Sequence, residues 1–432
     1  MKSFGKTFVL SFLLHLLFAA PLLHANLVSE LVRDEKADSI GNIADMSDFF
    51  AHQKNYVPGE PLNRVEKTVY LAFNIWLRND GSGVFTDEEH INLKLHELLE
   101  RLNRLFYRTP LPTSPIEGVD YLRDSHIRFE VKAIDYYRNS DLYEVTCGSG
   151  PRLNQYVFNK HPHKRQYLNL HFTSGYCQGA TGYANNPTGR NLERDSYVVS
   201  FLKQDIDQYE YGFWAFMLHI AHELGHSFEL RHPYDSEFCR FSHPDFLFDL
   251  FGFEKQDWCE NPRSNCDVCF HDGKWRCDID DPQTTCTNNI MGGNRNSGSI
   301  TPLQMGRMNR TLAIRNLRKY AWGYSPEPFV VETSQLWKFN KKFYQDIRIA
   351  SGATLHLTGT LEMVPDAGII LEPGSKLIVD GGVITNALYS DFLWQGIIIE
   401  PAVSRGWAFW RKEQTEGEVI LLNNATITNA IQ

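Results

Sequence analysis

The chain has 432 residues and a formal net charge of −9, and 42% of its residues are apolar and 13% aromatic. A single hydrophobic core rarely grows beyond about 250 to 300 residues, so at least two domains are expected. The apolar content excludes a disordered chain as the default interpretation. Lys and Arg form no dense basic block, which argues against a nucleic-acid partner.

The N-terminus has the pattern of an export signal. Two lysines precede an apolar run from Phe8 to Leu23, and a small residue, Ala25, follows. This order is typical of a signal peptide over residues 1–25, and the run is short for a membrane span of about 20 residues. We therefore expect a secreted, extracellular protein with no membrane span in the mature chain; a membrane anchor is the alternative. Removal of residues 1–25 takes away two lysines and no acidic residue, which moves the net charge from −9 to −11.

The next segments contain a predicted leader, a strand and a helix. Residues 26–62 have few apolar repeats and no cysteine, which favours a short leader or propeptide. Residues 70–77 are predicted to form a buried strand, and residues 79–83 a turn. Thr86 and Glu89 have the spacing of a capping box at the start of a helix. One apolar stripe of that helix is predicted at Ile91, Leu95, Leu98, Leu99, Leu102, Leu105 and Phe106.

Three further strands and two helices are predicted before residue 322. The strands fall at residues 127–134, 167–172 and 197–202, where aromatic and β-branched residues are frequent. An apolar helix is expected over residues 211–230. A second helix should begin at the capping box of Thr301 and Gln304 and end near Lys319. This order of elements indicates an α+β fold.

All eight cysteines lie between Cys147 and Cys286. In an exported chain an even number of cysteines predicts disulfide bonds, although their pairing cannot be read from the sequence. A structural zinc site is the alternative, because the C-terminal cluster contains a CxxC spacing. That cluster consists of Cys259, Cys266, Cys269, Cys277 and Cys286.

The composition changes after Trp322. Residues 323–345 include two prolines and are predicted to be a linker. In residues 346–432, the segment 352–357 is similar to 374–379 at a spacing of 22 residues, and 383–387 is similar to 426–430 at a spacing of 43, close to two such periods. This repeat favours an all-β segment that forms the start of a parallel β-solenoid (β-helix), with a β-sandwich edge as the alternative. Because solenoids need caps, a fragment or an unusually short solenoid is expected.

The sequence His222-Glu223-Leu224-Gly225-His226 is the motif with the clearest chemistry. On a helix it places two imidazoles one turn apart on one face, and His232 follows six residues later as a third ligand. Three neutral imidazoles would leave the fourth position of one catalytic zinc ion (Zn2+) to water, and Glu223 is placed to act as the general base. His219, one turn before His222, is expected to pack rather than to bind the metal.

These residues resemble the zinc motif HExxHxxGxxH of the metzincin metallopeptidases, and the chain is most similar to the secreted pappalysin-type (cytophagalysin-like) members. The resemblance covers residues 63–322 and implies a zinc-dependent endopeptidase that acts on a protein or peptide substrate. It also implies a Met-turn at residues 288–292, with Met291 beneath the ligands. The strand around Gly182, Tyr183 and Ala184 would then bind an extended substrate.

Two departures from the family pattern leave a second function open. Glu229 stands where the family has Gly, and a non-Gly residue with positive φ costs about 1 kcal/mol there. Gly293 stands where related enzymes often have a Tyr that binds the oxyanion, and loss of one such donor costs about 100-fold in rate. The alternative is therefore a catalytically weak or inactive binding or adhesion protein.

Other functions have less support in the sequence. A polysaccharide-active solenoid has no assignable pair of carboxylates. The acidic cluster Asp278, Asp280 and Asp281 would suit Ca2+, although a solvated loop is the simpler interpretation. The oligomeric state and the cleavage preference cannot be read from the sequence.

Overall fold

A computed structural model describes most of the chain after residue 48. The described residues are 49, 51–112, 115–177, 180–185, 195–202, 212–232, 247, 249, 268–271, 274–277, 285–286, 288–292, 298–387, 392–402 and 415–431. The predicted signal peptide and residues 26–48 lie outside this set. Among the described residues, no helix has both the length and the apolar character that a membrane crossing requires.

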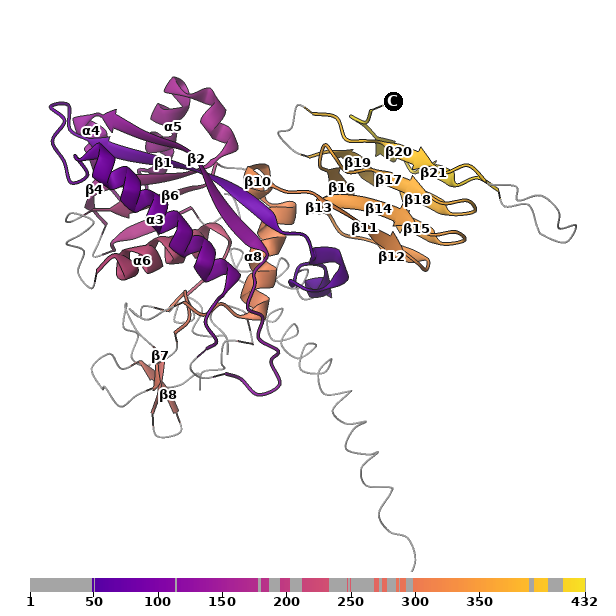
Figure 1. Cartoon of the computed structure of the whole chain (residues 1–432), viewed down its shortest axis with the longest axis horizontal. Coiled ribbons are helices and arrows are strands. Elements are labelled where there is room, and N and C mark those ends of the chain that lie inside the picture. The colour runs from indigo at the N-terminus through magenta and orange to yellow at the C-terminus, as the bar shows by residue number, and fades with distance from the viewer. Residues whose placement is uncertain are drawn as a thin grey trace, which may run out of the picture. The chain divides into compact units, whose positions relative to one another are not determined.

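A mixed seven-stranded sheet forms the centre of the N-terminal part (Figure 1). Its strands are β1 (Lys67–Leu77), β2 (Ile127–Arg138), β3 (Glu144–Thr146), β4 (Leu168–Tyr176), β5 (Gly182–Ala184), β6 (Tyr197–Phe201) and β10 (Ala321–Trp322). β2, β1, β4 and β6 are parallel neighbours, whereas β5 pairs with β6 in the antiparallel direction. The three predicted strands at 127–134, 167–172 and 197–202 are therefore confirmed as β2, β4 and β6.

Helices cover both faces of this sheet. On one face, alternate residues of β1, from Val69 to Ile75, pack against helices α3 (Glu88–Tyr107) and α6 (Gly212–Ser227). On the other face, Trp76 and Phe201 pack against α5 (Gly150–Lys160). The side-chain alternation of strands makes this arrangement possible, because each strand then contributes to two cores. The mixed α/β character is confirmed.

Helix α3 has the predicted apolar stripe but a different cap. Six of the seven predicted stripe residues are buried, and Leu99 packs at the edge of the core. The capping box of Thr86 and Glu89 is wrong, because Asp87 is the N-cap and its carboxylate accepts a hydrogen bond from the His90 backbone N–H. Both Thr86 and Asp87 are good N-caps, so the sequence alone does not choose between these adjacent positions.

Four helices differ from the prediction. Helix α5 and the short helix α4 (Ser140–Tyr143) were not predicted. The last helix begins as expected, with a complete capping box of Thr301 and Gln304, but α8 spans Pro302–Ile314 and ends before Lys319. A separate 3-10 helix, η7 (Asn316–Tyr320), follows it. α6 likewise ends at Ser227, before the predicted end at residue 230.

The C-terminal part forms three parallel sheets of four strands each, stacked in successive coils (Figure 1). This is the arrangement of a three-sided β-solenoid, and the described residues contain four coils. The first two coils are β11 (Ser325–Val331), β12 (Gln335–Trp337), β13 (Lys341–Phe343), β14 (Gln345–Ile349), β15 (Thr354–Leu357) and β16 (Thr360–Met363). The next two are β17 (Ile369–Leu371), β18 (Lys376–Asp380), β19 (Val383–Asn386), β20 (Ile397–Ile399), β21 (Glu418–Leu422) and β22 (Thr426–Ile427).

One of the two repeat spacings was predicted correctly, whereas the other spacing and the linker were misread. Leu355 pairs with Leu377, which confirms the 22-residue period. Val383 pairs directly with Thr426, so the 43-residue spacing is one lengthened coil and not two periods. The linker predicted at residues 323–345 is wrong, because β11, β12 and β13 form the first coil there. Its prolines do not prevent pairing, because β11 is an edge strand of its sheet.

The segment predicted as a leader contributes to a core where it is described. Residues 53–63 contain the 3-10 helices η1 (Gln53–Asn55) and η2 (Pro61–Asn63). Between them Tyr56 is buried, and its hydroxyl group donates a hydrogen bond to the carbonyl oxygen of Asn340. Residues 53–63 therefore contribute a buried side chain to the described fold; whether residues 26–62 are a leader that is removed from the mature protein stays a prediction.

Candidate metal centre

Helix α6 positions the first two histidines of the predicted metal site. His222 and His226 lie one turn apart, and each uses its Nδ1 atom to contact a backbone carbonyl oxygen. His222 Nδ1 lies 2.8 Å from the oxygen of Ile290, and His226 Nδ1 lies 3.0 Å from the oxygen of Leu230. A carbonyl fixes the proton on Nδ1 and leaves the Nε2 lone pair free to bind a metal ion.

A tight turn after α6 brings in the third histidine. The N–H of Leu230 bonds the carbonyl of Gly225 at 2.9 Å, and the N–H of Glu229 bonds that of His226 at 3.0 Å. This is a Schellman motif, with Glu229 at the position that requires positive φ, and its φ is 66°. Glu229 therefore has the positive φ that was considered in the sequence analysis.

The three imidazoles converge on one point. His232 Nε2 lies 3.0 Å from His222 Nε2 and 3.1 Å from His226 Nε2, and the three form a candidate metal-binding group. Burial lowers the pKa of His222 to about 3 and that of His226 to about 4, and it lowers the pKa of His232 well below its ordinary value. All three are therefore neutral near pH 7, which is the form that binds a metal ion.

Glu223 lies beside this histidine group and is 6% exposed. Burial raises the pKa of its carboxyl group to about 8. Its Oε2 atom is buried and has no hydrogen-bond partner among the described residues. A cation bound by the histidines would favour the carboxylate form of Glu223, because an opposite charge nearby lowers the pKa of an acid. The donor set and this carboxylate therefore fit a zinc ion.

Met291, in the predicted Met-turn, packs against α6. It is fully buried, and its Sδ atom would lie 2.5 Å from a Cβ atom added at Gly225. Asn289 closes the turn by accepting a hydrogen bond from the Met291 N–H, and its side-chain amide exchanges two hydrogen bonds with Gln304 at the start of α8. Gln304 thus connects the turn to α8, a role that the sequence analysis missed.

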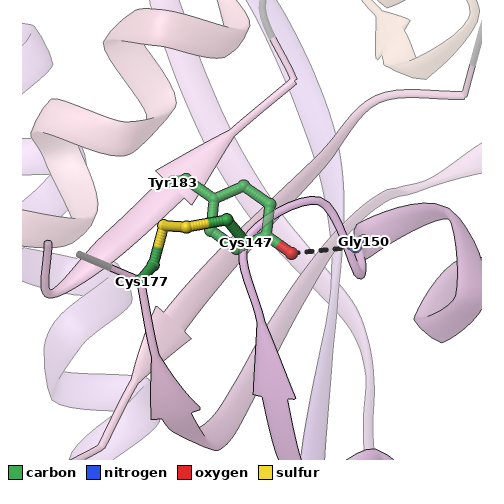
Figure 2. The surroundings of a disulfide bond; sticks show 4 residues. All are labelled: Cys147, Gly150, Cys177 and Tyr183. Atoms are coloured by element: carbon green, nitrogen blue, oxygen red, sulfur yellow. Dashed lines mark hydrogen bonds between the residues drawn. A yellow bond between two sulfur atoms is a disulfide. The ribbon is translucent and has the colours of Figure 1, made fainter.

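The strand predicted to bind substrate is β5, at the edge of the sheet next to α6. Gly182 is buried, and Tyr183 and Ala184 are half-buried. Figure 2 shows that the Tyr183 hydroxyl accepts a hydrogen bond from the Gly150 N–H beside the disulfide bond Cys147–Cys177. This bond confirms the oxidised state for two cysteines; the side chains of the other six lie outside the described residues.

His219 packs between α6 and β5. Its Nδ1 atom lies 3.3 Å from the Thr181 hydroxyl group and 3.9 Å from Glu223 Oε1. Its ring occupies the space that a Cβ atom at Gly182 would need, at 2.7 Å. His219 is absent from the candidate metal-binding group, in agreement with the packing role predicted for it.

Two predicted features lie outside the described residues. These are the acidic cluster Asp278, Asp280 and Asp281, and Gly293 after the Met-turn. In this region the structure describes only the backbone of three short strands, β7 (Val268–His271), β8 (Lys274–Cys277) and β9 (Thr285–Cys286). The Ca2+ hypothesis and the missing oxyanion donor therefore stay predictions.

Comparison with known proteins finds a likeness among solved structures but none at the level of sequence. No protein-family model matches the sequence, and no curated protein sequence matches it. Among solved structures, mature mirolysin of Tannerella forsythia in complex with a cleaved peptide has a TM-score of 0.38 and 14% sequence identity. The match covers 60% of this chain and 96% of the mirolysin chain.

Proposed function

We propose that this protein is an exported zinc-dependent endopeptidase of the metzincin type. The observation that carries this proposal is the convergence of His222, His226 and His232, whose ligand atoms all lie within 4.8 Å of one another, next to the buried carboxyl group of Glu223. A protein that needed zinc only for stability would have no use for a carboxylate in that place. The pappalysin-type assignment rests on the motif resemblance, and export rests on residues 1–25.

When bound, a zinc ion would supply Lewis-acid chemistry and would lower the pKa of a water molecule. His222, His226 and His232 would hold it. The Glu223 carboxylate would accept a proton from the attacking water and return it to the leaving amine. The backbone carbonyls of Ile290 and Leu230 would hold two of the imidazoles in the metal-binding orientation.

The substrate would bind as an extended strand beside β5. This strand pairs with β6 on one side, and no other described strand pairs with it. Backbone N–H and C=O groups on an open strand edge can pair with a peptide. β5 contacts α6, which carries His222 and His226, so Gly182, Tyr183 and Ala184 would form one wall of the site.

The rival function is a binding or adhesion protein that has lost catalysis. The solenoid would then display a surface, and the zinc group would serve only stability. Glu229 supports the binding protein less strongly than the sequence indicated, because its carboxylate forms ion pairs with arginines of α8 and its C-cap. Gly293 is the departure that still favours it.

Replacement of the base separates the two functions. Glu223→Gln keeps the shape of the side chain and should retain zinc while losing at least about 100-fold of the hydrolysis of a denatured protein substrate. Metal content and hydrolysis are measured on the same preparations, with and without a chelator. Equal hydrolysis by wild type and variant would contradict the role of Glu223. Zinc bound in both without any hydrolysis would favour the binding protein.

A further inference from the structure

Glu229 occupies a backbone position that ordinarily belongs to glycine. Its φ of 66° lies in the left-handed region, which is sterically unfavourable for a residue that has a Cβ atom. The position is the first residue after the cap of α6, and only Leu230 and Arg231 separate it from His232. A glycine here would remove this steric cost, so a glutamate at this position needs another physical reason.

The carboxylate of Glu229 supplies that reason. Its side chain has no exposed surface and lies among three arginines and a threonine of α8 and its C-cap. Arg315 Nε donates to Oε1 at 3.1 Å, and Thr311 Oγ1 donates to Oε2 at 2.9 Å. The Nε atom of Arg307 is 3.6 Å from Oε2, and the Nη1 atom of Arg310 is 4.0 Å from it. A buried carboxylate is stable in such a place only when it is paired and hydrogen-bonded.

We propose that Glu229 is a positioning residue, which holds the turn after α6 against α8 and thereby places His232 for metal binding. The cluster of Glu229, Arg307, Arg310, Thr311 and Arg315 is named the turn clamp. This inference rests on the zinc-binding part of the proposed function and adds a residue that the motif does not contain.

The turn clamp acts on the backbone as well as on the carboxylate. Thr311 Oγ1 lies 3.1 Å from the carbonyl oxygen of Phe228, the residue before Glu229. The carbonyl oxygen of Leu230, two residues after Phe228, contacts His226 Nδ1. The same few residues therefore link α8, the orientation of His226 and the path of the chain to His232. Groups that orient metal ligands typically change metal affinity by about 10-fold to 100-fold when they are removed.

The test compares one replacement that relieves the steric cost at this backbone position with one that leaves it unchanged. Glu229→Gly removes the steric resistance at positive φ and the carboxylate together, whereas Glu229→Gln keeps the side-chain shape and removes the charge. The turn clamp predicts that both variants bind zinc at least about 10-fold more weakly than wild type, measured by competition with a chelator of known affinity at a temperature where all proteins are folded. Glu144→Gln is the matched control, because Glu144 also pairs with an arginine, Arg78, at 2.6 Å but is exposed.

A second measurement distinguishes positioning from general stability. In a His232→Ala background, Glu229→Gly should weaken the residual zinc binding less than about twofold, because the ligand that the turn clamp positions is then absent. An equal loss with and without His232 would overturn the proposal in favour of a purely structural role. Wild-type affinity in both Glu229 variants would overturn it as well. Absence of zinc from the wild type would instead contradict the proposed function.

Discussion

The buried Lys342 predicts a pH dependence of stability that can be calculated from the structure. Lys342 is 1% exposed, and its Nζ atom donates hydrogen bonds to the carbonyl oxygens of Arg318 and Ala321 at 2.9 and 2.7 Å. These bonds connect β13 of the first solenoid coil to η7 and β10. Burial lowers the pKa of Lys342 from 10.5 to about 7. The replacement Lys342→Met removes the titrating group and keeps an apolar chain of similar length.

The difference in proton binding between the folded and unfolded chains sets the direction in which the free energy of unfolding changes with pH. Between pH 7 and 10.5 the unfolded chain binds the proton of Lys342 more tightly than the folded chain does, so the free energy of unfolding rises with pH. This contribution to the free energy of unfolding is complete above pH 10.5, decreases steadily as the pH falls from 10.5 to 7, and is absent below about pH 7. Integration from pH 7 to 9 gives about 2 kcal/mol for this one group. Lys67, whose pKa is also lowered to about 7, adds a similar term in both proteins and cancels in the comparison.

Urea unfolding at pH 7, 8 and 9 measures the effect. The rise in unfolding free energy over this range should be about 2 kcal/mol smaller in Lys342→Met than in wild type. Lys376→Met serves as a control, because Lys376 is an exposed lysine of the same solenoid, paired with Glu418. Parallel pH profiles of wild type and Lys342→Met would refute the reasoning, and would show that the Lys342 ammonium group reaches water in the folded protein.

Two further predictions concern β5 and the disulfide bond. Gly182→Ala places a Cβ atom 2.7 Å from the His219 ring and 2.8 Å from the Val199 carbonyl oxygen, so β5 must shift. We expect kcat/KM for a peptide substrate to fall at least about 10-fold while the zinc content stays unchanged. An unchanged kcat/KM would exclude β5 from substrate binding. The double replacement of Cys147 and Cys177 by Ser opens a cross-link across 30 residues and should lower the unfolding free energy by about 3 to 4 kcal/mol. A loss below about 1 kcal/mol in urea unfolding would contradict a constraint by this disulfide.

The sequence predicted the features that depend on local periodicity. The apolar stripe of α3, the capping box of α8 and the zinc motif on α6 each involve residues a few positions apart, so their geometry follows from helix parameters. The 22-residue solenoid period was visible because residues 352–357 and 374–379 have similar sequences. Helix α5 had a readable signal that was missed, since Pro151 lies at its start and Leu153 and Val157 share one face.

Other features depend on contacts that no local pattern encodes. The positive φ of Glu229 was considered from the motif, but Arg307 and Arg315 lie about 80 residues further along the chain. The pairing of Gln304 with Asn289 had no signal beyond the capping box that Gln304 also completes. The first solenoid coil was missed because it is spaced 20 residues from the second, as in the pairing of Gln335 with Leu355, rather than 22.

The short length of β5 has a consequence for solubility. An open sheet edge can recruit strands from other protein molecules and so begin aggregation, and native proteins limit this risk with short edge strands. β5 contains three residues, and just before it the Ala180 N–H bonds back to the carbonyl of Cys177, which the disulfide bond fixes to Cys147. Such an edge offers too few backbone groups to begin an extended intermolecular sheet. It is still long enough to hold a few residues of a peptide.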